Sequence, residues 1–164
     1  MNIDTIIFNT AKKNGFSDAV AKNLVAQARY ESNDYKSNVF KNNNNLFGYK
    51  YVGQPNATAG TIAPKSEWTN INVAQYYAKY KSVEDSALEV IKWLYRRENE
   101  GKFKVSDLIT AQAYAEALKK GGYYGQTSYE YAQGLLAKYK NIILVAASSL
   151  SLFVIIAFLL LIKK

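Results

Sequence analysis

Acid–base chemistry in this sequence has to come from carboxylates, lysines or tyrosines. The 164 residues include no histidine and no cysteine, which excludes Ser-His-Asp triads, imidazole catalysis, thiol nucleophiles, disulfides and metal sites built on His or Cys. Among the groups that remain, a pair of carboxyl groups is the usual equipment for hydrolysing sugars. Catalysis would therefore depend on the 13 Asp and Glu residues, and we predict neither a metal nor a cofactor.

Three of these acids lie where the chain looks irregular: Glu31 after an apolar helix, Asp34 in the next loop, and Glu67 in a segment rich in turn residues. The others, Asp4 among them, fall in first turns, on exposed helix faces or beside basic residues, where simpler roles suffice. A general acid must be protonated near neutral pH, and a helix C-terminus with apolar packing favours that state. Glu31 is therefore the candidate acid; the alternative is a carboxylate hydrogen-bonded in the following loop.

The hydrophobic pattern predicts the elements that must position these acids. Apolar residues recur at helical spacing over residues 3–14, 18–30, 83–98, 107–120 and from 128 onward. Residues that cap or start these helices precede or open each stretch: Asn2, Ser17, Ser82, Ser106 and Ser128. The helix after Ser106 would bury Ile109.

Two segments lack helical periodicity. Residues 32–45 are polar and rich in Asn, which predicts a loop. Over residues 46–80, short β-branched and aromatic stretches alternate with Gly and Pro, which predicts a hairpin or small β-lobe. The sequence therefore indicates an α+β fold that is mainly helical.

The stretch AQARYESNDYKSNVFKNNNNLFGYK, residues 26–50, carries a pattern of Glu-Ser at a helix end, a later Ser, and Asn-Asn-Leu-Phe-Gly with a following Lys. The pattern consists of Glu31, Ser32, Ser37, Asn44, Asn45, Leu46, Phe47, Gly48 and Lys50. Further pieces follow in order: Glu67-Trp68, residues 80–86, Gly122-Tyr123 and Tyr131-Ala132. Together they resemble the glucosaminidase family of peptidoglycan hydrolases (glycoside hydrolase family 73), over about residues 15–140.

The resemblance implies a lysozyme-like domain that cleaves the β-1,4 bond after N-acetylglucosamine in the glycan strands of peptidoglycan. Glu31 matches the family's general acid, and Glu67 matches a lobe carboxylate that acts as base or stabilises the transition state. Tyr123 matches an aromatic residue that lines the cleft. Ser37, Asn45 and Phe47 lie in the matched motifs and are further substrate-binding candidates, with core packing as the alternative for Tyr123 and Phe47.

The chain departs from the family pattern in two places. The family has Gly-aromatic-Gly after Glu-Ser, whereas this chain has Asn33, Asp34 and Tyr35. Asn and Asp tolerate left-handed backbone, so the turn can still form. Asp34 would add a negative charge near Glu31, which either raises the pKa of the acid or marks a degenerate site. After Tyr123, the family's Thr-Asp is missing, which alters part of the substrate subsite.

Two other functions are compatible with this sequence. A lytic transglycosylase of the same fold needs a single glutamate, and an inactive membrane-anchored structural or sugar-binding module needs none. Retention of both Glu31 and Glu67 favours the hydrolase. The net charge of +8 suits anionic partners, but the lysines are scattered and no recognition motif occurs, so we predict no nucleic-acid partner.

The C-terminal segment has the composition of a membrane span. Residues 142–162 contain no charged side chain, and at helical rise they would extend about 31 Å, the thickness of a bilayer's hydrocarbon core. Lysines flank the segment on both sides, so the positive-inside rule does not orient it. The sequence thus predicts a lysozyme-like domain over residues 1–140 and one transmembrane helix within residues 141–164.

The N-terminal residues place an acid before, and lysines after, their short apolar stretch, the reverse of a secretory signal peptide. The domain would then stay on the cytoplasmic side of a membrane, away from peptidoglycan. We hypothesise a lipid-containing virion, whose membrane would carry the protein as a lysin used in wall penetration, with capsid or vertex proteins as further partners. The alternative location is the bacterial cytoplasmic membrane.

The membrane span generates the first prediction. Deleting residues 142–164 should convert a chain that needs detergent into a freely soluble one, because about 20 apolar side chains have no stable place in water. Ultracentrifugation without detergent checks this, and the shortened chain should keep its activity. A deletion variant that still sediments with membranes would contradict the predicted anchor.

Overall fold

The computed structural model describes residues 2–140 and 142. Its α-helices are α1 (Ile3–Lys13), α2 (Asp18–Glu31), α3 (Asn38–Asn43), α4 (Val83–Asn99) and α5 (Ala111–Lys120). Its strands are β1 (Ala57–Ile62) and β2 (Tyr76–Tyr80), and two 3-10 turns are η1 (Lys65–Glu67) and η2 (Val105–Asp107). Residues 128–140 are also helical. The mainly helical α+β fold with a small two-stranded sheet confirms the prediction.

No helix in this described part of the chain is long and apolar enough to cross a membrane. Apart from Ile142, the predicted span over residues 142–162 lies outside the described residues. The division into a domain and an anchor therefore stays a prediction.

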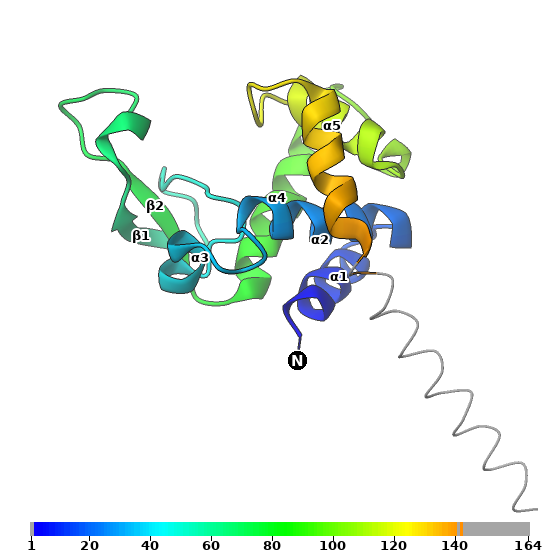
Figure 1. Cartoon of the computed structure of the whole chain (residues 1–164), viewed down its shortest axis with the longest axis horizontal. Helices are drawn as coiled ribbons and strands as arrows, with labels where there is room; N and C mark the ends of the chain where they lie inside the picture. Colours follow the sequence, from blue (N-terminus) through cyan, green and yellow to red (C-terminus); the bar gives the residue numbers. More distant parts are fainter. Residues whose placement is uncertain (1, 141, 143–164) are drawn as a thin grey trace, which may run out of the picture.

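Helix α2 lies at the centre of the helical part. Eight of its residues are buried, on every side of the helix: Val20, Ala21, Asn23, Leu24, Val25, Ala26, Gln27 and Ala28. Figure 1 shows α1, α4 and the helix of residues 128–140 (orange) around it, and α1 also packs against α4. The last residue of this buried helix is Glu31.

The polar residues inside α2 fix the helices around it. The side-chain amide of Asn23 donates to the Leu108 carbonyl at 2.9 Å, and its oxygen accepts from the Tyr139 hydroxyl at 2.7 Å. The Gln27 oxygen accepts from the Tyr114 hydroxyl at 2.7 Å. These contacts join α2 to α5, to the segment before it and to the helix of residues 128–140.

The β-lobe is a twisted antiparallel pair that projects away from the helices (Figure 1). Strand β2 pairs with β1 on one side, with an irregularity between Ala59 and Ile62, and meets residues 49–51 on the other through the bridge between Lys50 and Tyr77. Gly60 lies at the irregularity, and a Cβ there would come within 2.5 Å of the Asn43 oxygen. Glycine at this position therefore lets α3 pack closely on the strand.

Three predictions about local structure are wrong. Ser106 does not cap a helix, because it lies in η2; α5 begins later, capped by Thr110, and Ile109 is 55% exposed. The predicted loop over residues 32–45 contains α3, which Ser37 caps and which buries only Asn43, so no apolar pattern indicated it. Asp4 lies in the first turn of α1 as predicted, but the expected solvation of its carboxylate is wrong: it is 2% exposed, and Arg29 and Tyr35 bind it.

Candidate active site

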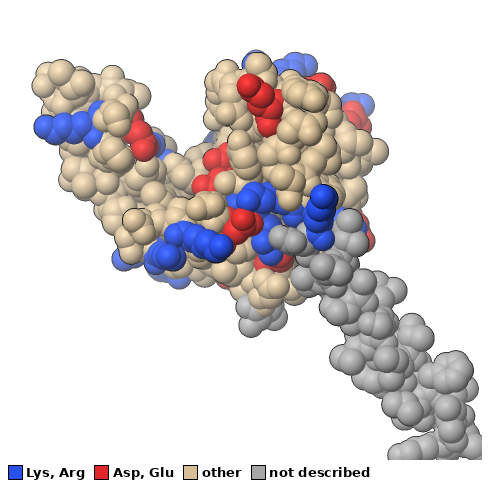
Figure 2. Space-filling view, in the orientation of Figure 1, with Lys and Arg blue, Asp and Glu red and all other residues tan. Residues whose placement is uncertain are grey.

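A cleft of about 260 Å³ brings five of the six predicted site residues together. Its walls are formed by Glu31, Ser37, Val39, Asn45, Phe47, Gly48, Lys50, Glu67 and Tyr77. Figure 2 shows a hollow between the β-lobe and the helical part of the molecule. Glu31 comes from the helical side and Glu67 from the lobe, so the fold places the two candidate carboxyl groups in one cleft.

Glu31 lies at the end of α2, beside a group of packed tyrosines. The hydroxyl of Tyr131 donates to Glu31 Oε1. Tyr131 is itself buried, stacks on Tyr124 with ring centroids 4.1 Å apart, and meets Tyr30 edge-on at 5.2 Å. Burial raises the pKa of Glu31 above its usual range, and the hydrogen bond from Tyr131 partly opposes that rise. The carboxyl group is thus biased toward its protonated form.

Glu67 has the opposite environment. It lies in η1, and its side chain is 43% exposed. Lys50 forms an ion pair with Glu67 Oε2, and the Tyr77 hydroxyl donates to both oxygens at 2.9 and 2.7 Å. The hydrogen bond from Lys50, followed by that from Tyr77, lowers the pKa of Glu67. This carboxyl group is therefore held ionised.

The contact between Lys50 and Tyr77 orders this side of the cleft. The two residues face each other across the bridge beside β2, and the Lys50 ammonium lies 3.7 Å from the centre of the Tyr77 ring. Lys50 was part of the sequence motif, whereas Tyr77 was not identified. Its place beside Glu67 follows from the strand register, which the sequence alone does not specify.

Asp34 does not act on Glu31 as expected. Its carboxylate binds Lys138 at 2.7 Å and Arg29 at 3.2 Å. The hydrogen bond from Lys138 is the main reason that the pKa of Asp34 is lowered. Because two cations balance its charge, burial rather than Asp34 raises the pKa of Glu31. The expectation of a direct charge effect on the acid is wrong.

Asn45 uses all of its side-chain hydrogen-bonding capacity within the protein. Its amide nitrogen donates to the carbonyls of Tyr49 and Ala78 at 2.8 and 2.9 Å. Its oxygen accepts from the backbone N–H groups of Phe47 and Tyr49 at 3.3 and 3.1 Å. An Asn side chain has two donors and two acceptor sites, so Asn45 shapes the wall of the cleft by tying the Asn-Leu-Phe-Gly turn to β2.

The other substrate-binding candidates also have structural contacts. Ser37 caps α3, accepting from the Phe40 N–H at 3.2 Å, and Phe47 is 4% exposed. Tyr123 does not line the cleft: its hydroxyl donates to the Phe47 carbonyl at 3.1 Å, and its ring meets Trp93 edge-on at 5.6 Å. These contacts support the wall from behind. Direct binding of sugar by these residues stays a prediction.

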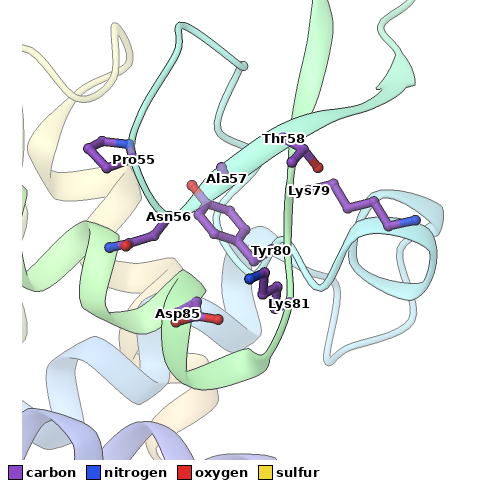
Figure 3. A pocket seen from close by; sticks show the side chains of 8 residues that line it. All are labelled: Pro55, Asn56, Ala57, Thr58, Lys79, Tyr80, Lys81 and Asp85. Atoms are coloured by element: carbon purple, nitrogen blue, oxygen red, sulfur yellow. The ribbon is translucent and has the colours of Figure 1, made fainter.

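A second pocket of about 410 Å³ lies between the start of β1, the end of β2 and the first turn of α4. Figure 3 shows Pro55 on one side, Lys79 on the other and the Tyr80 ring between them. It contains none of the predicted site residues, and its one acidic lining residue, Asp85, accepts from the Ser82 hydroxyl at 3.0 Å. Of these two pockets in the described part of the chain, only the smaller one is lined by a pair of carboxyl groups.

A mainly helical fold with two carboxyl groups of opposite protonation preference in one cleft has the equipment of a glycoside hydrolase. A family model of glucosaminidases, described as mannosyl-glycoprotein endo-beta-N-acetylglucosaminidase, matches residues 9–144. The chain belongs to this glucosaminidase family. Comparison with curated protein sequences gave no match.

Solved structures of similar fold include an autolysin catalytic domain and a peptidoglycan hydrolase. The catalytic domain of the autolysin Auto from Listeria monocytogenes is 25% identical, with a TM-score of 0.58 over 87% of this chain and 81% of that one. A peptidoglycan hydrolase from Sphingomonas sp. A1 is 20% identical, with a TM-score of 0.62 over 86% and 88%. A type VI secretion effector–immunity complex from Pseudomonas protegens contains a chain that is 17% identical, with a TM-score of 0.61 over 85% and 88%. The fold is thus the lysozyme-like one that the sequence predicted.

The site generates a prediction about pH. Activity should fall as pH drops through the lowered pKa of Glu67 and as it rises through the raised pKa of Glu31. In Tyr131→Phe, the hydrogen bond that lowers the pKa of Glu31 is lost, so the basic limb of the kcat/KM profile should move to higher pH. The acidic limb should stay, because Tyr131 does not contact Glu67.

Tyr129→Phe is the matched control for this prediction. Tyr129 lies on the same helix but is 66% exposed, so loss of its hydroxyl should leave both limbs in place. A Tyr131→Phe profile identical to that of the parent protein would contradict the assignment of the basic limb to Glu31.

Proposed function

We propose that this glycoside hydrolase cleaves the β-1,4 bond after N-acetylglucosamine in peptidoglycan, with Glu31 as general acid and Glu67 as the partner carboxylate. The observation that carries the proposal is the division between the two groups: burial favours the protonated form of Glu31, and Lys50 with Tyr77 favours the ionised form of Glu67. Family membership and the likeness to a Listeria autolysin domain support peptidoglycan as the substrate.

The reaction follows from these protonation states. Glu31 donates its proton to the oxygen of the departing sugar as the bond between that oxygen and the anomeric carbon breaks. Positive charge then develops on the remaining sugar ring. The Glu67 carboxylate either accepts a proton from the attacking water or stabilises the charge, in which case the now ionised Glu31 accepts that proton. The water oxygen bonds to the anomeric carbon, so the product carries a reducing end.

The contacts around Glu67 support hydrolysis over transglycosylation. A lytic transglycosylase needs no second carboxylate, yet here two donors hold Glu67 ionised at the cleft wall. Product analysis separates the two reactions, because a transglycosylase leaves an anhydro sugar in place of a reducing end.

We also propose that residues 142–162 anchor the enzyme in a bilayer. The support is the absence of charge over that segment, and the deletion of residues 142–164 described above is its test. The setting of a lipid-containing virion remains a proposal that rests on sequence alone.

The assignment of Glu31 generates a direct prediction. Glu31→Gln should lower the rate of wall cleavage by about 10²- to 10⁴-fold, because the amide has nearly the same shape but no proton to donate. Mass spectrometry of products released from purified peptidoglycan measures the rate, and circular dichroism confirms folding. The matched control is Glu116→Gln on the exposed face of α5, which should leave the rate unchanged. Near-normal cleavage by Glu31→Gln would refute the assignment.

The role of Glu67 predicts a split between turnover and binding. Glu67→Gln should lower kcat by about ten-fold or more while substrate binding changes little, because the carboxylate acts when charge develops in the transition state. Sedimentation with insoluble peptidoglycan measures binding separately from turnover. If both quantities match those of the parent protein, Glu67 is only a surface residue of the lobe.

A further inference from the structure

Three consecutive non-glycine residues, separated from the candidate acid only by Ser32, have left-handed backbone. Asn33, Asp34 and Tyr35 have φ angles of 52°, 52° and 65°. L-amino acids adopt this conformation at a cost, and Asn and Asp adopt it more readily than Tyr does. Backbone of this kind persists only where its surroundings hold it in place.

A charged cluster of five side chains surrounds this turn. Asp4 accepts from the Arg29 guanidinium at 2.6 and 2.9 Å and from the Tyr35 hydroxyl at 2.6 Å. Asp34 accepts from Arg29 at 3.2 Å and from Lys138 at 2.7 Å. Two residues of the turn itself, Asp34 and Tyr35, are therefore fixed by groups from three different helices.

The charges of the cluster balance, and solvent screens them only partly. Two carboxylates face two cations; the side chains of Asp4 and Arg29 are 3% and 15% exposed, and those of Asp34 and Lys138 are 31% and 22% exposed. By contrast, the side chains in the ion pair of Lys12 with Asp18 are 40% and 70% exposed. Loss of one partner from a shielded cluster leaves an uncompensated charge, which makes its members interdependent.

The turn joins two segments that both line the cleft. Glu31 precedes it, and Ser37 and Val39 follow it, and all three are lining residues. The helix of residues 128–140 contacts both the acid and the turn, because Tyr131 donates to Glu31 and Lys138 donates to Asp34. These two residues are seven apart, or about two helical turns, so they project from the same face.

We propose that Asp34 is a positioning residue for Glu31: through Arg29 and Lys138 it holds the left-handed turn and thereby fixes the acid against Tyr131. The paired charges stabilise a left-handed turn that glycine would adopt through its conformational freedom. This inference rests on the proposed function for its kinetic consequence and deepens it by naming what keeps the acid in place.

The experiment compares two substitutions at Asp34 in the full chain. Asp34→Ala removes the carboxylate and keeps a Cβ, so the turn should relax and let water reach Glu31. The expected result is a fall in kcat of about 10- to 100-fold, as a small misplacement of a catalytic group produces. Asp34→Gly also removes the carboxylate, but it adopts a positive φ without strain. The kcat of Asp34→Gly should therefore be at least several-fold higher than that of Asp34→Ala.

The pH profile provides a readout that general destabilisation would not give. In Asp34→Ala, water around Glu31 should lower the pKa of the acid, so the basic limb should move to lower pH. The titratable or charged groups near Glu31 are Tyr131, Tyr123, Lys50 and Glu67, and none of them is altered by the substitution. The acidic limb, which reflects Glu67, should therefore stay.

Two further variants complete the test. Lys138→Met should shift the basic limb as Asp34→Ala does. The double variant should lose little more kcat than either single variant, because both substitutions break the same contact. If Asp34→Ala does not fold, Lys138→Met carries the test. Asp18→Ala, which removes the exposed ion pair with Lys12, is the control and should change neither kcat nor the profile.

An NMR titration of the Glu31 carboxyl group separates this inference from the proposed function. A lower pKa in Asp34→Ala than in the parent protein supports the positioning role even if the chain cleaves no peptidoglycan, in which case only the proposed function fails. An unchanged Glu31 pKa with an unchanged basic limb would overturn the inference. Equal loss of kcat in Asp34→Ala and Asp34→Gly would overturn it as well.

Discussion

Helix α2 passes through the centre of the helical part, and its buried polar groups favour packing that gives them partners, because burying an unpaired polar group is costly. Asn23 is paired with Leu108 and Tyr139, and the Gln27 oxygen is paired with Tyr114, whereas the Gln27 amide nitrogen has no partner among the described residues. Those contacts determine where α5 and the helix of residues 128–140 pack. The position of Glu31 follows, because it is the last residue of this buried helix.

The chemistry of the cleft depends on the unequal burial of Glu31 and Glu67. The helical side gives Glu31 aromatic neighbours, whereas the lobe gives Glu67 a cation, a phenol and access to water. Two residues of the same type thus acquire different protonation states from their positions alone. A lobe that approached closely enough to bury Glu67 would remove this difference, so a hollow between the two parts serves the reaction as well as substrate entry.

The sequence predicted those features that depend on neighbours along the chain. The caps at Asn2, Ser17 and Ser82 are present, and the family resemblance singled out Glu31 and Glu67 as the two carboxyl groups of the site. Features that depend on distant partners were missed. Asp4 resembled an ordinary first-turn acid because its partners, Arg29 and Tyr35, come from elsewhere in the sequence. Tyr77 could not be placed beside Glu67 without the strand register, and α3 has almost no buried face that a periodic pattern would reveal.

The helix of residues 128–140 is part of the active site as much as of the scaffold. It supplies the phenol that binds Glu31 and the ammonium that binds Asp34, although both lie about a hundred residues away in sequence. The smallest autonomous enzyme that could be cut from this chain must therefore extend at least through Lys138. A fragment that ended at α5 would keep both candidate carboxyl groups. It would lack Tyr131 and Lys138, the side chains that influence the protonation and the position of Glu31.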